Sequence, residues 1–185
     1  VLSQELLDLG FEIYSTICIV RADQDYPRKH PNHLPQQFLQ SHRVTGNGNE
    51  ITVELLQNFY KPKYSINEDD NPKEWWEVID RTTGEVVSTD NWYYSDGCVT
   101  VRNTVTWHEY TVNFLAYQTW DSTSMYNHLT NGWTCDKVIS VNPFIPEVYD
   151  HLMKHFDSWL AKHPDTAVVR FTTFAYMFML VSDID

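Results

Sequence analysis

The spacing of apolar residues predicts two amphipathic helices, one near each end of the chain. The first follows Ser3, a residue type that caps helices, and Gly10 interrupts it. Its apolar positions fall near the period of an α-helix at Leu6, Leu7, Ile13, Tyr14 and Ile17. The second begins at Pro146, a residue type favoured in a first helical turn, and ends at His163 and Pro164. Its broad apolar stripe comprises Val148, Tyr149, Leu152, Met153, Phe156, Trp159 and Leu160.

Between these helices, turn-forming residues separate short apolar stretches and predict antiparallel strands. The pattern gives hairpins at 37–43 with 51–59 around 45–49, at 75–80 with 85–87 around 81–84, and within 91–102 around 95–97. An earlier segment, 21–35, contains Pro27, Pro31 and Pro35, so we expect a loop there instead of a regular helix.

Residues 107–133 dominate the second half of the chain, because an apolar run there leads into a polar segment. The run at 110–120 lacks clean alternation, which indicates a strand covered on both faces. With the helix from Pro146 and a short apolar strand at 167–173, it predicts a βαβ unit and therefore a parallel sheet. We expect an α/β fold with a hairpin-rich part at about 36–106 and the βαβ unit at about 107–180.

Composition narrows the possible ligands and the compartment. A net charge of -12 disfavours binding to nucleic acid or to an anionic membrane, and a neutral or weakly charged substrate fits better. Seven Trp and eleven Tyr supply flat rings that suit sugars, although core packing accounts for most such rings. Three cysteines without a CxxC pair favour a reducing, cytoplasmic location.

Arg170 stands out because it is a charged residue inside an apolar strand. It shares a strand face with Val168 and Thr172, where an unpaired buried charge is costly. One interpretation is an internal salt bridge. The other is an arginine that holds substrate hydroxyls or a phosphate at the carboxyl end of a parallel strand, where α/β proteins bind ligands.

Other polar residues give weaker signals. Asn127 could donate to and accept from vicinal sugar hydroxyls, but asparagine in a loop is more often a turn former. His30 and His33 form an HxxH pair without a second pair to complete a metal site. His108 and Glu109 are neighbours on a strand, so their side chains point to opposite faces. The residues by themselves therefore predict a polar site but no reaction.

Four segments resemble one enzyme family. They are WWEVIDRTTGEVV at 75–87, HEYTVNFLAYQTWD at 108–121, MYNHLTNGW at 125–133 and VVRFTTFAYMF at 168–178. Each is similar to the 1,3-β-galactosyl-N-acetylhexosamine phosphorylases, also called galacto-N-biose/lacto-N-biose phosphorylases, and they occur in the same order with similar spacing. The resemblance covers nearly the whole chain but only the N-terminal part of the family's catalytic domain.

The resemblance implies a partial (β/α)8 TIM-type barrel with an antiparallel, hairpin-rich insertion in the first half. It implies an inverting phosphorylase that converts galacto-N-biose or lacto-N-biose and phosphate to α-galactose 1-phosphate and the free N-acetylhexosamine. In this reaction one carboxylic acid protonates the leaving oxygen while phosphate attacks the anomeric carbon. No organic cofactor or metal is implied, since phosphate is a substrate, and the full-length protein could form a homodimer.

The resemblance also assigns substrate-binding residues to this chain. Arg170 matches a substrate-binding arginine, and Asn127 matches a substrate-binding asparagine with Tyr126 beside it. The loop from Asp121, which includes Thr123, is expected to touch the acceptor sugar, and its small hydroxyl residues favour galacto-N-biose. Relatives that act on galactosyl-rhamnose leave that substrate as an alternative.

Two family residues fall outside the chain according to the resemblance. The acid aspartate would lie beyond Asp185, and one substrate-contacting arginine would lie before Val1. We therefore expect the chain to be an N-terminal fragment that is inactive alone. Two alternatives remain, namely a stand-alone carbohydrate-binding module and a truncated product whose few barrel strands leave open edges.

Overall fold

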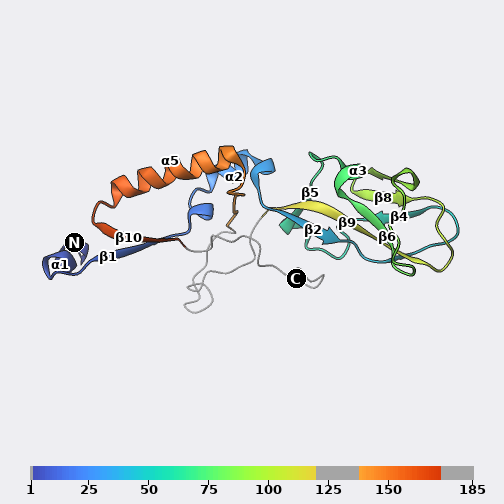
Figure 1. The fold of residues 1–185 in the computed structure, drawn as a ribbon, viewed down its shortest axis with the longest axis horizontal. Coiled ribbons are helices and arrows are strands. Elements are labelled where there is room, and N and C mark those ends of the chain that lie inside the picture. Colours follow the sequence, from blue (N-terminus) through green and yellow to red (C-terminus); the bar gives the residue numbers. More distant parts are fainter. Residues whose placement is uncertain (1, 120–137, 172–185) are drawn as a thin grey trace. The chain divides into compact units, whose positions relative to one another are not determined.

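The computed structural model describes residues 2–119 and 138–171, which form two compact units (Figure 1). Unit 1 consists of residues 2–35 and 138–171, and unit 2 consists of residues 36–119. Each unit has its own cluster of buried apolar side chains. No helix in these two ranges is long and apolar enough to cross a lipid bilayer.

Unit 1 contains a two-stranded parallel sheet and several helices. Its elements are α1 (Leu2–Asp8), β1 (Ile13–Ile17), η1 (Ile19–Arg21), α2 (Asp25–Lys29), η2 (Pro31–His33), α5 (Pro146–Lys162) and β10 (Thr166–Phe171). The predicted first helix ends at Asp8, because Gly10 adopts a φ of 82° and reverses the chain. The residues that follow are rich in β-branched side chains and form β1, so the helical reading of 13–17 was wrong.

The parallel partner of β10 is β1. Their register places Tyr14 beside Val168 and Thr16 beside Arg170. Strand β1, helix α5 and strand β10 thus form a βαβ arrangement, and the prediction that the apolar run at 110–120 supplies its first strand is wrong. All of unit 2 is inserted in the chain between β1 and the helix α5 that leads to β10.

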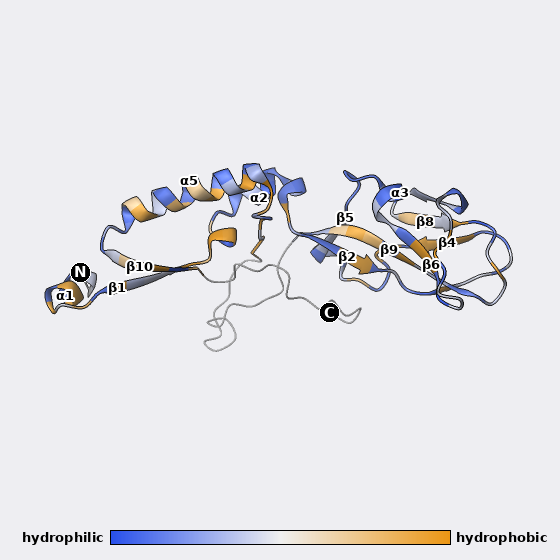
Figure 2. Cartoon of the chain, viewed as in Figure 1, coloured by the Kyte–Doolittle hydropathy of each residue, from blue (hydrophilic) through white to orange (hydrophobic). Residues whose placement is uncertain are grey.

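Helix α5 confirms the predicted helix, with Pro146 in its first turn and Lys162 at its end. Figure 2 shows apolar and polar patches alternating along this helix, as expected of an amphipathic element. The buried core of unit 1 comprises Ile17, Ile19, Val20, Val141, Val148 and Leu152. Phe156 extends this contact toward the strand, since its ring lies 5.1 Å from that of Phe171.

The proline-rich segment 21–35 is not the irregular loop that the sequence predicts. It contains α2, which spans only five residues and includes Pro27, followed by the 3-10 turn η2. An aromatic stack holds this segment to α5, because the ring of Tyr26 lies 4.2 Å from His30 and 3.8 Å from His151. Packing against the long helix thus supports a segment whose prolines disfavour helix.

Unit 2 consists of two packed antiparallel sheets. One contains β2 (Gln36–Gln40), β3 (Val44–Thr45), β5 (Tyr64–Ile66), β6 (Glu77–Asp80) and β9 (Glu109–Gln118), and the other contains β4 (Ile51–Glu54), β7 (Trp92–Ser95) and β8 (Cys98–Val101). Short helical turns connect them at η3 (Lys61–Lys63), α3 (Pro72–Trp75) and η4 (Thr89–Asn91). Strand β9 is central, because β2, β3, β5 and β6 all pair with it.

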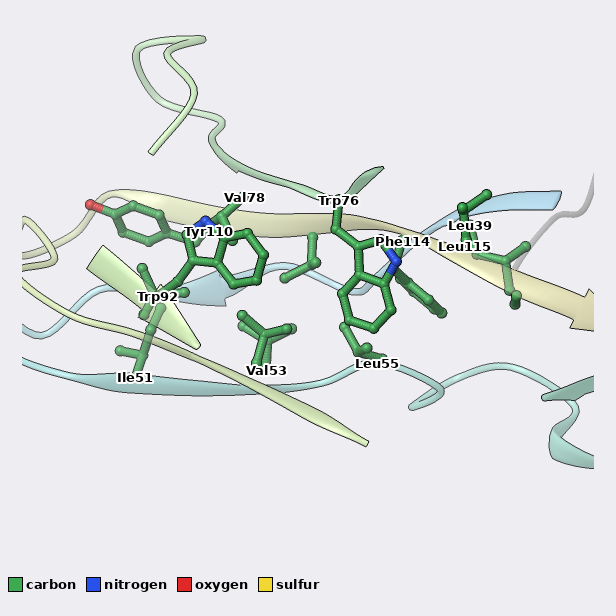
Figure 3. Packing of buried hydrophobic residues seen from close by; sticks show 14 of the residues in the cluster. Leu39, Ile51, Val53, Leu55, Trp76, Val78, Trp92, Tyr110, Phe114 and Leu115 are labelled. Atoms are coloured by element: carbon green, nitrogen blue, oxygen red, sulfur yellow. The ribbon is translucent and has the colours of Figure 1, made fainter. Parts of the chain in front are cut away.

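The core of unit 2 lies between the two sheets (Figure 3). Side chains from β4, including Val53, face Trp76 across this space, and Trp92 of β7 enters it from the same sheet as β4. Val112 and Phe114 of β9 are fully buried in the same cluster. The apolar run at 110–120 is therefore a central antiparallel strand, which explains why its sequence lacks the alternation of a strand with one face in water.

Two of the three predicted hairpins are confirmed. Residues 77–80 pair with 85–87 around the turn at 81–84, and β7 pairs with β8 around Asp96 and Gly97. The third is wrong, because β2 pairs with β9 and β4 pairs with β8. The glycine-rich residues at 45–49 thus connect the two sheets and do not close a hairpin.

Asp80 organises the turn that follows β6. Its carboxylate accepts hydrogen bonds from the backbone N–H groups of Thr82 (2.9 Å) and Thr83 (3.3 Å) and lies 2.7 Å from Nδ1 of His108. Burial alone would raise the pKa of Asp80, but the hydrogen bonds from His108, Thr82 and Thr83 outweigh it and hold the pKa below its ordinary value. The ionised carboxylate therefore stabilises the folded unit.

Replacing Asp80 should destabilise unit 2 in a pH-dependent way. We expect Asp80→Ala to lower its free energy of unfolding by about 2–3 kcal/mol near pH 7, since three contacts to a charged acceptor are lost. The folded pKa lies below the unfolded value of about 3.9, so this contribution is present above that pH and disappears as the pH falls. Urea titration followed through the NMR signals of β9 reports on this unit separately.

Glu85→Ala, which removes an exposed carboxylate from the same turn, serves as the matched control. Its free energy of unfolding should stay within about 0.5 kcal/mol of the parent. An Asp80→Ala effect that stays constant from pH 7 to well below about pH 4 would contradict the assigned pKa direction.

Candidate functional site

The candidate site of unit 1 lies on the parallel strand pair. Arg170 is on β10 near its carboxyl end and is the register partner of Thr16 on β1. Val169 packs toward α5, so Arg170, which is adjacent in the strand, projects from the opposite face. Tyr14 and Val168 share that face with Arg170 as a directly paired couple.

Arg170 is exposed, which corrects the expectation of a buried charge that requires a partner. Among the residues that the structure describes, none forms an ion pair with its guanidinium. The salt-bridge interpretation thus has no support within these residues, while five N–H donors remain available to a ligand. The surrounding face is partly apolar, since Tyr14 is 68% exposed and Val168 is 39% exposed.

A polar cluster follows the carboxyl end of β1, and no local pattern in the sequence predicts it. Arg21 donates from Nε to the hydroxyl of Ser140 at 3.0 Å. Gln24 donates to the carbonyls of Arg21 and Ile139 and accepts from the Ile139 N–H. Burial lowers the pKa of Arg21, and the nearby Cys18 thiol opposes this change. The contacts of Arg21 with Ser140 and of Gln24 with Ile139 join residues more than a hundred positions apart, which a local pattern cannot predict.

Four of the sequence-predicted site residues lie outside the described residues. They are Asp121, Thr123, Tyr126 and Asn127. The chain on each side of this segment is fixed, since Thr119 donates to the carbonyls of Lys63 and Pro62 and Val141 donates to the carbonyl of Val20. Of the predicted substrate-binding set, the structure therefore places Arg170.

The other histidine signals belong to packing and to turn geometry. His30 stacks on Tyr26, and His33 Nδ1 lies 2.9 Å from the Tyr26 hydroxyl. Within the described ranges, no group of three or more His, Cys, Asp or Glu side chains has an arrangement that could hold a metal ion. His108 contacts Asp80 while Glu109 contacts Arg43, so these neighbours do not act together.

The arrangement of unit 1 can bind an anion or a polyol. The described residues supply the N–H donors of the Arg170 guanidinium near the carboxyl end of β10, which is where α/β folds place ligands. They also place a helix on one face of the strands and Arg170 on the other. These donors can hold a ligand, but by themselves they do not define a reaction.

Comparison with known proteins identifies the family. The family described as "Lacto-N-biose phosphorylase N-terminal TIM barrel domain" matches residues 1–185. A 1,3-β-galactosyl-N-acetylhexosamine phosphorylase of Bifidobacterium longum subsp. longum is 38% identical over 185 residues, covering 98% of this chain and 25% of the relative.

Two relatives from Lachnoclostridium phytofermentans agree with this match. A D-galactosyl-β-1→4-L-rhamnose phosphorylase is 36% identical over 180 residues, covering 96% of this chain and 25% of the relative. A 1,3-β-galactosyl-N-acetylhexosamine phosphorylase is 35% identical over 183 residues, covering 97% of this chain and 25% of the relative. The chain thus spans about a quarter of the length of these relatives. With a match along its whole length, the chain belongs to the lacto-N-biose phosphorylase family.

Proposed function

We propose that this chain forms the first part of the catalytic barrel of a glycoside phosphorylase that acts on a β-galactosyl-N-acetylhexosamine. The family match over residues 1–185 carries this proposal. The named activities of the relatives, which all are phosphorylases of galactosyl disaccharides, supply the reaction class. The remaining three quarters of such a protein would supply the other strands and the acid.

The geometry of unit 1 supports a barrel. In a (β/α)8 barrel each strand is followed by a helix on the outside, and strand faces opposite the helices line the interior. Strand β1, helix α5 and strand β10 have this order, and α5 covers one face of the pair. The face that carries Arg170 would then be interior, and its exposed Tyr14 and Val168 would be covered by further strands.

The proposed reaction is a direct displacement at the anomeric carbon of galactose. A phosphate oxygen forms the new bond as the glycosidic bond breaks, which inverts the configuration and gives α-galactose 1-phosphate. A carboxylic acid transfers its proton to the leaving oxygen of the N-acetylhexosamine. The resemblance places this acid beyond Asp185, so none of the described carboxylates is assigned that role.

Among the residues that the structure describes, we assign Arg170 to substrate binding. Its planar guanidinium can donate two parallel hydrogen bonds to a phosphate or to neighbouring hydroxyls. Asn127 and Tyr126 are assigned to the sugar by the resemblance, and Asp121 with Thr123 to the acceptor side. The small hydroxyl residues of that loop favour galacto-N-biose, while the galactosyl-rhamnose phosphorylase among the relatives keeps rhamnose as the alternative acceptor.

A hybrid enzyme that carries this chain in place of the matching segment of a relative tests the proposed role of Arg170. Residues 1–185 should replace the matching segment of the Bifidobacterium relative and retain phosphate-dependent release of galactose 1-phosphate from galacto-N-biose. In this hybrid, Arg170→Ala should lower kcat/KM about 10- to 150-fold, because a hydrogen bond to a charged group contributes about 1.5–3 kcal/mol. The kcat/KM of Arg170→Lys should lie between those of the hybrid and of Arg170→Ala, since lysine keeps the charge and loses the planar guanidinium.

Arg28→Ala is the matched control, because Arg28 is an exposed arginine of the same unit and pairs only loosely with Asp25 at 3.7 Å. Its kcat/KM should equal that of the hybrid. If Arg170→Ala retains full kcat/KM while the hybrid is active, the assigned role of Arg170 is wrong. Parallel assays with galactosyl-rhamnose show which acceptor the segment favours.

The 185-residue chain alone should release no galactose 1-phosphate from galacto-N-biose and phosphate. The reason is that the resemblance assigns the proton donor and one substrate-contacting arginine to positions outside it. Mass spectrometry of the reaction mixture, with the full-length Bifidobacterium relative as the positive control, measures this. Phosphate-dependent product formation by the purified chain would mean that a described or neighbouring carboxylate serves as the acid.

A further inference from the structure

Unit 2 has a groove on the side of its larger sheet that faces away from the second sheet. The groove has a volume of about 390 Å³ and is lined by Phe38, Leu39, Gln40, Trp75, Glu77 and Asn113. This volume falls within the range of small-molecule pockets. All of these residues belong to unit 2.

The register of the sheet explains how three polar side chains come together. Asn113 of β9 is paired directly with Gln40 of β2 on one side and with Glu77 of β6 on the other. Directly paired residues in a sheet project to the same face. The two neighbours of Asn113, Val112 and Phe114, are fully buried in the core, so this polar row faces away from it.

Arg81 fixes the orientation of the two amides. Its Nη2 lies 2.7 Å from Oε1 of Gln40 and 3.4 Å from Oδ1 of Asn113, while its Nε donates to the Thr111 hydroxyl at 2.7 Å. An arginine can only donate, so the oxygen of each amide must face it. The two NH2 groups are therefore turned away from Arg81, and no described residue accepts a hydrogen bond from them.

Two aromatic rings flank this polar row. Trp75 is 52% exposed and Phe38 is 60% exposed, although both are large and apolar. Trp75 is held outward because its neighbour Trp76 is 3% exposed and anchors the chain in the core. Lys73 ties the same short helix to the second sheet by donating to the carbonyls of Thr89 and Trp92. The backbone that carries Trp75 is thus held in place by the fold.

This combination matches the chemistry of a sugar. A sugar ring has an apolar C–H face that packs on an aromatic ring, and hydroxyls that both donate and accept. The groove offers exposed rings, two oriented amide donors and the Glu77 carboxylate as an acceptor with no partner among the described residues. Glu77 and the net charge of -12 disfavour an anionic ligand.

We propose that the groove formed by Phe38, Gln40, Trp75, Glu77 and Asn113, all of them residues of unit 2, binds a neutral saccharide. The aromatic rings hold the apolar face of the sugar, and the amides and carboxylate bind its hydroxyls. Such a site would hold carbohydrate near the enzyme without taking part in bond cleavage. It does not depend on the proposed phosphorolysis, since it belongs to unit 2 alone.

NMR titration of the ¹⁵N-labelled 185-residue chain tests this site. Lactose, methyl β-D-galactoside and N-acetylglucosamine are the probes, and galactose 1-phosphate is the charged comparison. We expect at least one neutral probe to shift the Trp75 indole and the Gln40 and Asn113 side-chain amide signals, with weaker binding of galactose 1-phosphate. Trp75→Ala should weaken this binding at least about tenfold, as expected for a residue that dominates a small site.

Glu77→Gln provides a second variant that keeps the shape of the groove, and it should also weaken binding by several-fold. Trp107→Ala is the matched control, because Trp107 is 82% exposed in the same unit and does not line the groove. Unchanged shifts in Trp75→Ala, or no shift at the groove with any of the three neutral probes, would overturn the proposal. Concentration-dependent shifts of the same signals without sugar would instead assign the groove to self-association.

Discussion

Strand β9 is the element on which unit 2 depends. Four other strands form their hydrogen bonds with its two edges, and its apolar side chains fill the space between the sheets. Both faces are also covered locally, since Thr111 on the side away from the core is buried beneath Arg81. A strand with this position needs apolar residues at most sites, which is the pattern seen at 110–118.

The local elements were predictable because nearby residues determine them. Pro146 and the apolar stripe after it specify α5, and the turn residues at 81–84 and 95–97 specify hairpins. Strand partners far apart in the sequence were not predictable in the same way. A central antiparallel strand and a buried parallel strand have the same apolar pattern. This pattern therefore predicts β9 as the parallel partner of β10, whereas that partner is β1.

Arg170 was recognisable from sequence because a charge within an apolar strand is unusual. Its burial was overestimated, since β10 has one pairing partner among the described residues and its face opposite α5 is open. Asn113, Gln40 and Glu77 gave no signal, because each is an ordinary polar residue in its own strand. Only the register of three strands brings them into one row beside exposed rings.

The position of the insertion links the two units in the chain. Unit 2 occupies the connection between the carboxyl end of β1 and helix α5, which is the side of a βα unit where barrels carry their functional loops. An insertion at that end can vary in length without disturbing the pairing of β1 with β10. A parallel pair needs only a crossover connection, and α5 lies in that connection. A compact sheet unit can therefore acquire a binding surface of its own while the register that sets Arg170 is preserved.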